Sequence, residues 1–182
     1  MRRVHFYVYI ALVLLIGGFM GNVYSVPIAD GAVISGGNLC YGAFMMASVM
    51  FVWVERDTFI LRHLVRLVIF VNIFKIVFAF LTQALLRADG VINTHNVPPD
   101  MFEASTYLIV VGGVLIIAEL LILLFIFEAA KKRISSPLAN GAIYILAFIL
   151  VLVLDGFAFF FIAFGVGSEI VAIVFGGIPG QV

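Results

Sequence analysis

The sequence predicts an all-α membrane protein, a polytopic bundle of six transmembrane helices that forms a single domain over residues 1–182. In composition, 65% of the residues are hydrophobic and only 11% are charged, whereas a soluble domain carries about 25% charged residues. The chain also contains a series of apolar runs near the length of about 20 residues that crosses a bilayer. Basic residues gather in every second connection between these runs, as cytoplasmic loops do. A soluble enzyme, a disordered chain and a disulfide-stabilised secreted scaffold are therefore excluded.

The predicted spans follow one another with short connections. Five runs are clear, at residues 4–26, 38–54, 64–86, 105–127 and 138–164. A sixth begins near Ser168 and is still apolar at Val182. As a helix it would measure about 22 Å, short of the ~30 Å hydrocarbon core. We therefore expect a last helix that is kinked in the glycine-rich segment 176–180, or one that is truncated. In the second case the chain is the N-terminal part of a longer protein.

The basic residues predict the orientation. Eight of the ten Lys and Arg residues fall on one side of the spans. They are Arg2, Arg3, Arg56, Arg62, Arg66, Lys131, Lys132 and Arg133. Because basic loops stay in the cytoplasm, both termini of a six-span protein are expected there, in a multi-pass protein of the cytoplasmic (inner) membrane. Loops 27–37 and 87–104 would face outside. The first run is retained as an anchor, because the alternation of charge needs it.

Several functions are excluded by what the sequence lacks. The formal net charge is zero, so we expect no nucleic acid partner. The single cysteine, Cys40, cannot form an intrachain disulfide. His5, His63 and His95 are far apart and none has metal-ligand spacing. The sequence contains neither a phosphate-binding glycine loop with a lysine nor a nucleophile–base pair. We therefore expect no enzyme, no metal and no cofactor.

Three ionisable residues fall inside the predicted spans. Lys75 lies near the middle of the third span, Glu119 in the fourth and Asp155 in the fifth. Intramembrane charges are costly and mark functional sites by default. If the three side chains face a common interior, they either form an ion-paired triad that pins three helices together or contact a ligand directly. Both interpretations stay open from the sequence.

Helical periodicity supports a shared interior. Residues at steps of three or four line one face of a helix, and four spans each have a polar or small stripe of this kind. The stripes are Asn38, Tyr41, Met45 and Ser48; Asn72, Lys75, Ala79 and Gln83; Gly112 and Glu119; and Asn140, Tyr144, Phe148, Val151 and Asp155. Small and polar residues also mediate helix packing in lipid. The stripes therefore fit either a binding site or a packed interface.

Aromatic residues crowd the outer halves of several spans. Most are expected to face lipid or the membrane interface. Tyr41 and Phe159 are the exceptions, because Phe159 lies one turn beyond Asp155 and Tyr41 shares the stripe of Asn38. Their rings could stack on a flat heterocycle.

The fifth span carries a family motif. Residues 154–165 read Leu-Asp-Gly-Phe-Ala-Phe-Phe-Phe-Ile-Ala-Phe-Gly. This resembles the vitamin uptake transporter-like (VUT) family, which includes the queuosine-precursor transporters. In that family an Asp is followed by Ser or Thr, then Phe and an Ile-Ala-Phe run. Gln181 matches a polar Gln in the family's next span, and Gly36-Gly37 resembles its glycine-rich entry. The transporters' Asn-Glu signature is replaced here by residues 47–58, so the chain looks closer to the vitamin-uptake-like sensor (VUPS) domains.

This resemblance implies a function. VUPS domains are the input part of signalling proteins that carry cytoplasmic output modules, so we expect a membrane-embedded sensor. Its ligand would be a small organic molecule, a flat heterocycle or an amine, and its output domain would form a homodimer. A transporter of nucleobase- or vitamin-like molecules and a structural subunit are the alternatives. The expected ligand-binding residues are Asp155, Glu119, Lys75, Asn72, Tyr41, Phe159, Asn38 and Gln181.

Overall fold

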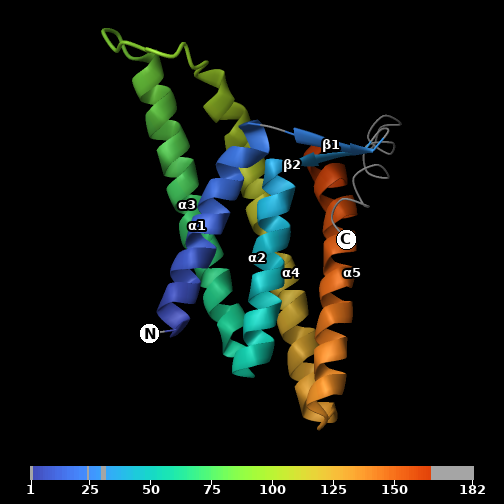
Figure 1. Cartoon of the computed structure of the whole chain (residues 1–182). Helices are drawn as coiled ribbons and strands as arrows, with labels where there is room; N and C mark the ends of the chain where they lie inside the picture. Colours follow the sequence, from blue (N-terminus) through green and yellow to red (C-terminus); the bar gives the residue numbers. More distant parts are fainter. Residues whose placement is uncertain (1, 24, 30–31, 165–182) are drawn as a thin grey trace.

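A computed structural model describes residues 2–23, 25–29 and 32–164 of the chain. Within these ranges it contains five α-helices and one β-hairpin (Figure 1). The elements are α1 (Arg2–Val23), β1 (Ser25–Ala29), β2 (Ala32–Ser35), α2 (Gly36–Glu55), α3 (Phe59–Arg87), α4 (Asp100–Arg133) and α5 (Pro137–Phe164). The strands pair in antiparallel fashion, with Val26 opposite Ile34.

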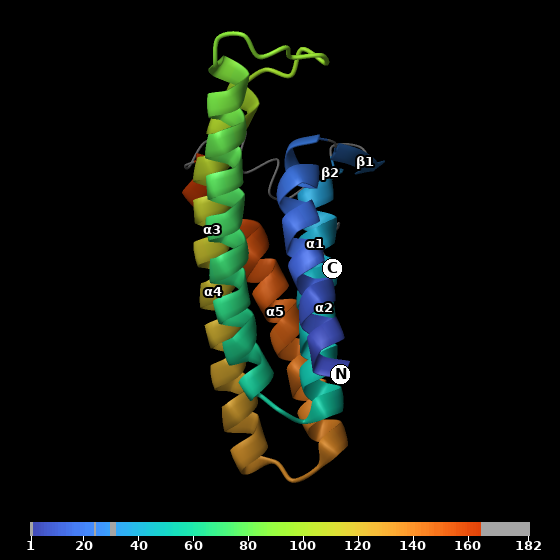
Figure 2. The same ribbon diagram turned by 90° about the vertical axis from the view of Figure 1, so that its left-hand side faces the viewer.

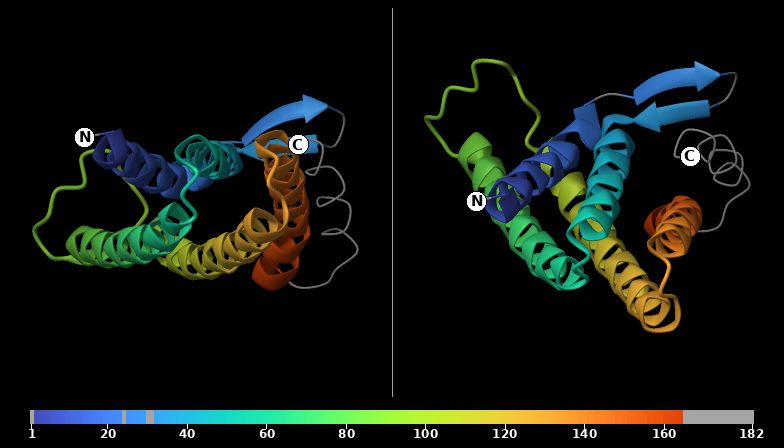
Figure 3. Two further views of the ribbon diagram at one scale, coloured as in Figure 1. Left: turned by 90° about the horizontal axis from the view of Figure 1, so that it is seen from below. Right: turned by 60° about the horizontal axis from the view of Figure 1, so that its bottom comes forward.

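Successive helices run in opposite directions (Figure 1). The eight clustered basic residues lie at or near one end of the bundle, which we call the basic end. The β-hairpin lies at the opposite end, called here the hairpin end. Figure 2 shows that α3 and α4 extend beyond the other helices at the hairpin end. Viewed along the bundle, α1 and α2 form one row, α3 and α4 form a second row packed against it, and α5 closes one side beside α2 and α4 (Figure 3).

Local signals explain where the helices begin. Ser35 caps α2, because its Oγ accepts a hydrogen bond from the Asn38 N–H at 3.2 Å. Between α2 and α3 the chain reverses within a few residues, and Arg56 takes the left-handed conformation with φ 54°. The Asp57 carboxylate then accepts a hydrogen bond from the Phe59 N–H at 3.0 Å. Pro137 opens α5, where its missing N–H costs no helical bond.

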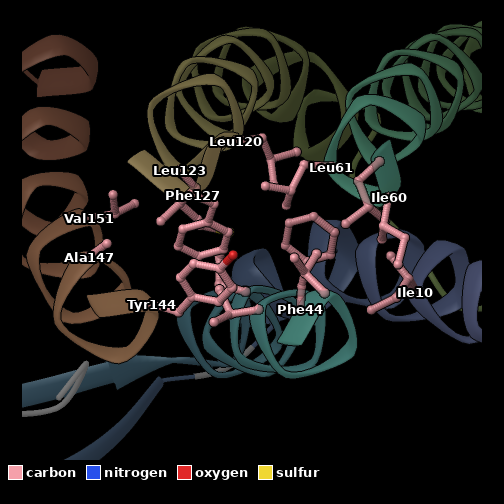
Figure 4. Packing of buried hydrophobic residues seen from close by; sticks show 14 of the residues in the cluster. Ile10, Phe44, Ile60, Leu61, Leu120, Leu123, Phe127, Tyr144, Ala147 and Val151 are labelled. Carbon is pink, nitrogen blue, oxygen red and sulfur yellow. The ribbon is translucent and has the colours of Figure 1, made fainter. Parts of the chain in front are cut away.

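The apolar core lies toward the basic end. All five helices contribute to it, and Phe127 of α4 stacks on Tyr144 of α5 with ring centroids 3.8 Å apart (Figure 4). On α3 the buried residues concentrate in the first ten positions, and Ala79 alone follows them among the described residues. Other fully buried members are Ile10, Phe44, Ile60, Leu61, Leu64, Leu120 and Leu123.

The outer surface of the bundle is apolar. Large side chains such as Phe70 (72% exposed) and Phe125 (76% exposed) face away from the core. A soluble protein does not expose this much contiguous apolar surface. Among the described residues, four helices are long and apolar enough to cross a membrane, over Gly36–Glu55, Phe59–Arg87, Tyr107–Arg133 and Pro137–Phe159. This supports a multi-pass membrane protein.

The described part of the chain confirms five helices and corrects two of the sequence predictions. Five helices rather than six are observed in the described part of the chain, and the predicted sixth span, 168–182, lies outside it. The helix predicted over 105–127 extends from Asp100 to Arg133, because its last turns leave the apolar run and pair at the basic end. The β-hairpin begins at Ser25, within the run predicted over 4–26, and overlaps the loop expected over 27–37. Sequence periodicity did not reveal its short strands.

Candidate polar site within the helix bundle

Three helices meet at a polar network formed by Tyr41, Glu119 and Asp155. Tyr41 of α2 and Glu119 of α4 each lie fourteen residues from the basic ends of their helices, Glu55 and Arg133. At about 1.5 Å per residue this places both about 21 Å from those ends. The Tyr41 hydroxyl donates a hydrogen bond to Glu119 Oε2 at 2.5 Å. The predicted stripes of α2 and α4 therefore do face each other.

Asp155 of α5 completes the network. Its carboxyl group lies near that of Glu119 and within electrostatic range of the Tyr41 phenol. Two carboxylates side by side in a low-dielectric interior repel each other. Glu119 and Asp155 form a pair of neighbouring carboxyl groups, called here the dyad, and Tyr41 donates a hydrogen bond to Glu119.

The dyad borders the apolar core. Glu119 is only 5% exposed, and Leu120 and Leu123 on the same helix are fully buried. On α5, Val151 and Leu152 lie one turn toward the basic end from Asp155 and are buried in the same core cluster. The carboxyl groups therefore lie at the boundary where the core ends. Water and ions are excluded on one side of them.

Toward the hairpin end, glycine, amide and aromatic residues replace the apolar core beside the dyad. Helical side chains tilt toward the N-terminus of their helix, so Glu119 projects along α4 toward the hairpin end. Two turns further in that direction are Gly112 and Gly113. A methyl carbon at Gly112 would lie 3.8 Å from the Phe159 ring, and one at Gly113 would overlap the Asn72 amide. Asn72 and Phe159 therefore approach this glycine pair from α3 and α5.

Lys75 does not join the dyad. The ion-paired triad, one of the two interpretations that the sequence left open, is not observed, because Lys75 forms no ion pair with Glu119 or Asp155, and none with any other described residue. Its side chain lies instead against α1, where a methyl carbon at Gly18 would be 2.7 Å from Lys75 Cδ. The physical reason is that Lys75 lies at the α1–α3 contact, whereas Asn72, one turn away, faces α4.

The remaining expected site residues are placed as follows. Asn38 lies in the first turn of α2, one turn from Tyr41 toward the hairpin end, and its backbone N–H is used by the Ser35 cap. Gln181 lies outside the described residues. In the described ranges there is no group of three or more His, Cys, Asp or Glu side chains that could hold a metal ion.

With the site in place, the chain was compared with known proteins. The model of the Vitamin uptake-like sensor (VUPS) family matches residues 4–182, nearly the whole length. The chain belongs to this family. The resemblance drawn from residues 154–165 is thereby confirmed, and the name of the VUPS family indicates a sensor domain related to vitamin uptake. The comparisons with curated proteins and with solved structures gave no match.

Two features of this VUPS domain were not expected from its sequence. The backbone of α4 at Gly113 lies close to the Asn72 side chain, and the backbone of α1 at Gly18 lies close to the Lys75 side chain. The adjacent pair Gly112-Gly113 was a signal, because small residues let helix backbones approach each other closely in lipid. The sequence has no comparable signal for the contact between Gly18 of α1 and helix α3, because that contact depends on how α1 crosses the bundle.

Proposed function

We propose that this VUPS domain is the input domain of a signalling protein and binds a small organic ligand at the Tyr41–Glu119–Asp155 network. One observation carries the proposal. Two neighbouring carboxyl groups, Glu119 and Asp155, lie inside the apolar bundle, and neither forms an ion pair with a Lys, Arg or His among the described residues. An intramembrane charge without a protein counter-ion favours a ligand that supplies one.

The surrounding residues suit a planar molecule. Phe159 offers a ring beside Gly112, and Asn72 offers an amide beside Gly113 that can donate and accept. A small number of polar groups beside an aromatic ring is typical of small-molecule sites. The ligand would approach from the hairpin end, because the core closes the other side. By the distribution of basic residues the hairpin end is the outer face.

The same geometry suggests how a signal could leave the site. At the basic end, ion pairs connect α1 to the α2–α3 turn and α3 to α4, through Arg3–Asp57 at 2.9 Å and Arg62–Glu128 at 2.9 Å. Helix α5 has no charged residue besides Asp155. We infer that ligand contact with Asp155 moves α5 against the ion-paired helices and biases a cytoplasmic output domain. That domain would form the homodimer, and the membrane domain itself would have no enzymatic activity.

A paired set of variants tests the site. The double variant Glu119→Gln/Asp155→Asn removes the charge of the dyad while keeping its size. The control Glu128→Gln/Asp100→Asn makes the same chemical change at the two ends of α4. Full-length protein in nanodiscs would be screened by thermal shift against nucleobases and vitamins. We expect a compound that stabilises the wild type to bind the double variant at least about tenfold more weakly, a loss of about 1.4 kcal/mol. Its affinity for the control variant should be unchanged.

The proposal would be overturned if the double variant bound as tightly as the wild type, or if no compound of either class bound. Loss of the fold in the double variant, with the control intact, would indicate that the network is structural. Uptake of a bound compound into proteoliposomes would show transport instead of sensing.

A further inference from the structure

We propose that Lys75 binds an anionic group of the ligand, such as the carboxylate of a flat aromatic acid, at a point of the bundle separate from the dyad. The inference rests on the proposed ligand site and specifies the charge of the molecule that enters it. It depends on where the Lys75 side chain lies, on its lack of an ion pair and on the level of the bundle that it shares with Tyr41.

Lys75 lies on the face of α3 that points into the bundle. It follows Val68 by seven residues and precedes Ala79 by four, so the three residues share one helical face. Val68 is 1% exposed and Ala79 is 3% exposed, whereas Lys75 between them is only partly buried. Part of this inward-facing side chain therefore remains accessible.

The Lys75 side chain extends along the backbone of α1. A methyl carbon at Gly18 would lie 2.7 Å from Lys75 Cδ and 3.1 Å from its Nζ, so the glycine leaves the room that the side chain occupies. The ammonium forms no ion pair with any described residue. An intramembrane cation without a counter-ion is costly. An anionic group of a ligand would offset this cost.

Two adjacent glycines of α1 place Lys75 and Tyr41 at a common level. Gly18 meets Lys75 of α3, and Gly17 meets α2, where a methyl carbon would lie 2.7 Å from Cys40 Cβ. Tyr41, the next residue of α2, donates its hydrogen bond to the dyad at 2.5 Å. The cation and the phenol therefore approach the interior from different helices at the same level of the bundle.

The contact between Lys75 and Gly18 lies close to the hairpin end of α1. Gly18 precedes Val23, the last residue of this helix, by five residues, a rise of about 7.5 Å. A molecule that enters from the hairpin end therefore meets Lys75 within about two turns of helix. The carboxyl groups of the dyad repel an anion and accept N–H donors. The arrangement favours a ligand whose acidic group binds Lys75 and whose N–H groups face the dyad.

Flat acids and their amides test the charge that Lys75 selects. The probes are nicotinate with nicotinamide and 4-aminobenzoate with 4-aminobenzamide, titrated on the full chain in nanodiscs. We expect at least one acid to bind the wild type about tenfold more tightly than its amide, because a charged pair strengthens the hydrogen bond. Lys75→Met should abolish this preference. Lys132→Met, the same change at the basic end, should keep it.

The proposal would be overturned if neither acid bound more tightly than its amide, or if Lys75→Met kept the preference of the wild type. The sensor proposal fails in a different way. A neutral compound that binds the wild type and is lost in Glu119→Gln/Asp155→Asn would support the ligand site even if both acids failed.

The stability of the ligand-free protein separates binding from a structural role. Because the Lys75 ammonium has no counter-ion among the described residues, Lys75→Met should raise the Tm while it weakens the binding of the acid. Lys132→Met should leave the Tm nearly unchanged. A lower Tm in Lys75→Met would show that Lys75 holds the helices together, which contradicts the proposal.

A substitution on α1 tests the position of the ammonium without changing its charge. In Gly18→Ala the new methyl group overlaps Lys75 Cδ and displaces the side chain. We expect the acid to bind at least about threefold more weakly and the amide to bind as it does to the wild type. Gly42→Ala is the control, because its methyl group has no neighbour within 4 Å. An equal loss for acid and amide in Gly18→Ala would assign the effect to helix packing and contradict a contact between Lys75 and the acid.

Discussion

The two halves of the bundle differ in the side chains that form the contacts between their helices. Toward the basic end, side chains from all five helices are fully buried against one another, and ion pairs connect the helix ends. Toward the hairpin end, polar groups and glycines occupy the contacts between helices, and α3 and α4 extend past their neighbours (Figure 2). The dyad lies where the two halves meet. This difference separates the residues that hold the fold from those proposed to bind, so each half can be altered with a distinct outcome.

The largest expected effect comes from truncating the core of the basic half. Phe127 is fully buried and stacked on Tyr144. Phe127→Ala should lower the free energy of unfolding by about 3–5 kcal/mol, because it leaves a cavity in addition to the lost contacts. Phe159→Ala, in the hairpin half, should cost less than about half of that, because Phe159 is only partly buried. Thermal and denaturant unfolding in detergent would measure both.

Phe125→Ala is the matched control, two residues away on α4 with its ring facing outward. It should change the free energy of unfolding by less than about 0.5 kcal/mol. If Phe127→Ala and Phe159→Ala had equal effects, the hairpin half would be packed as firmly as the core. The contrast between the halves would then be wrong.

A smaller effect is expected from the glycines of the hairpin half. A methyl group at Gly113 would overlap the Asn72 amide, whereas one at Gly42 would have no neighbour within 4 Å. Gly113→Ala should therefore destabilise the protein by about 1–3 kcal/mol through overpacking. Gly42→Ala should stabilise it by up to about 1 kcal/mol through helix propensity. Thermal unfolding of the two variants side by side would measure the difference.

The cause can be isolated with a second change. Asn72→Ala removes the amide that the new methyl group meets, so it should restore most of the stability lost in Gly113→Ala. If the double variant stayed as unstable as the single one, the backbone of α4 rather than the Asn72 contact would limit the packing. The hairpin half would then contain a tightly packed helix contact at Gly113 other than the one with Asn72.

The sequence predicted the parts of this arrangement that depend on one helix at a time. Apolar length placed the five described helices, and helical periodicity put Tyr41, Glu119 and Asp155 on stripes that do converge. Lys75 was misplaced because its neighbour depends on how α3 rotates between α1 and α4, and one turn of helix separates those two contacts. The β-hairpin escaped prediction because its strands are too short for a clear alternation.

The smallest expected effect concerns the ion pairs of the basic half. Glu55 pairs with both Arg2 and Arg3, whose side chains are exposed. Glu55→Gln should lower the free energy of unfolding by less than about 1 kcal/mol, because exposed ion pairs gain little in water. The difference from the wild type should shrink further at about 1 M salt, where the screening length falls to about 3 Å. A loss comparable to that of Phe127→Ala, and insensitive to salt, would mean that these contacts and not the apolar core stabilise the basic half. The expected result would instead assign the stability of the basic half to its apolar core and leave the ion pairs to align the helix ends, as the proposed movement of α5 requires.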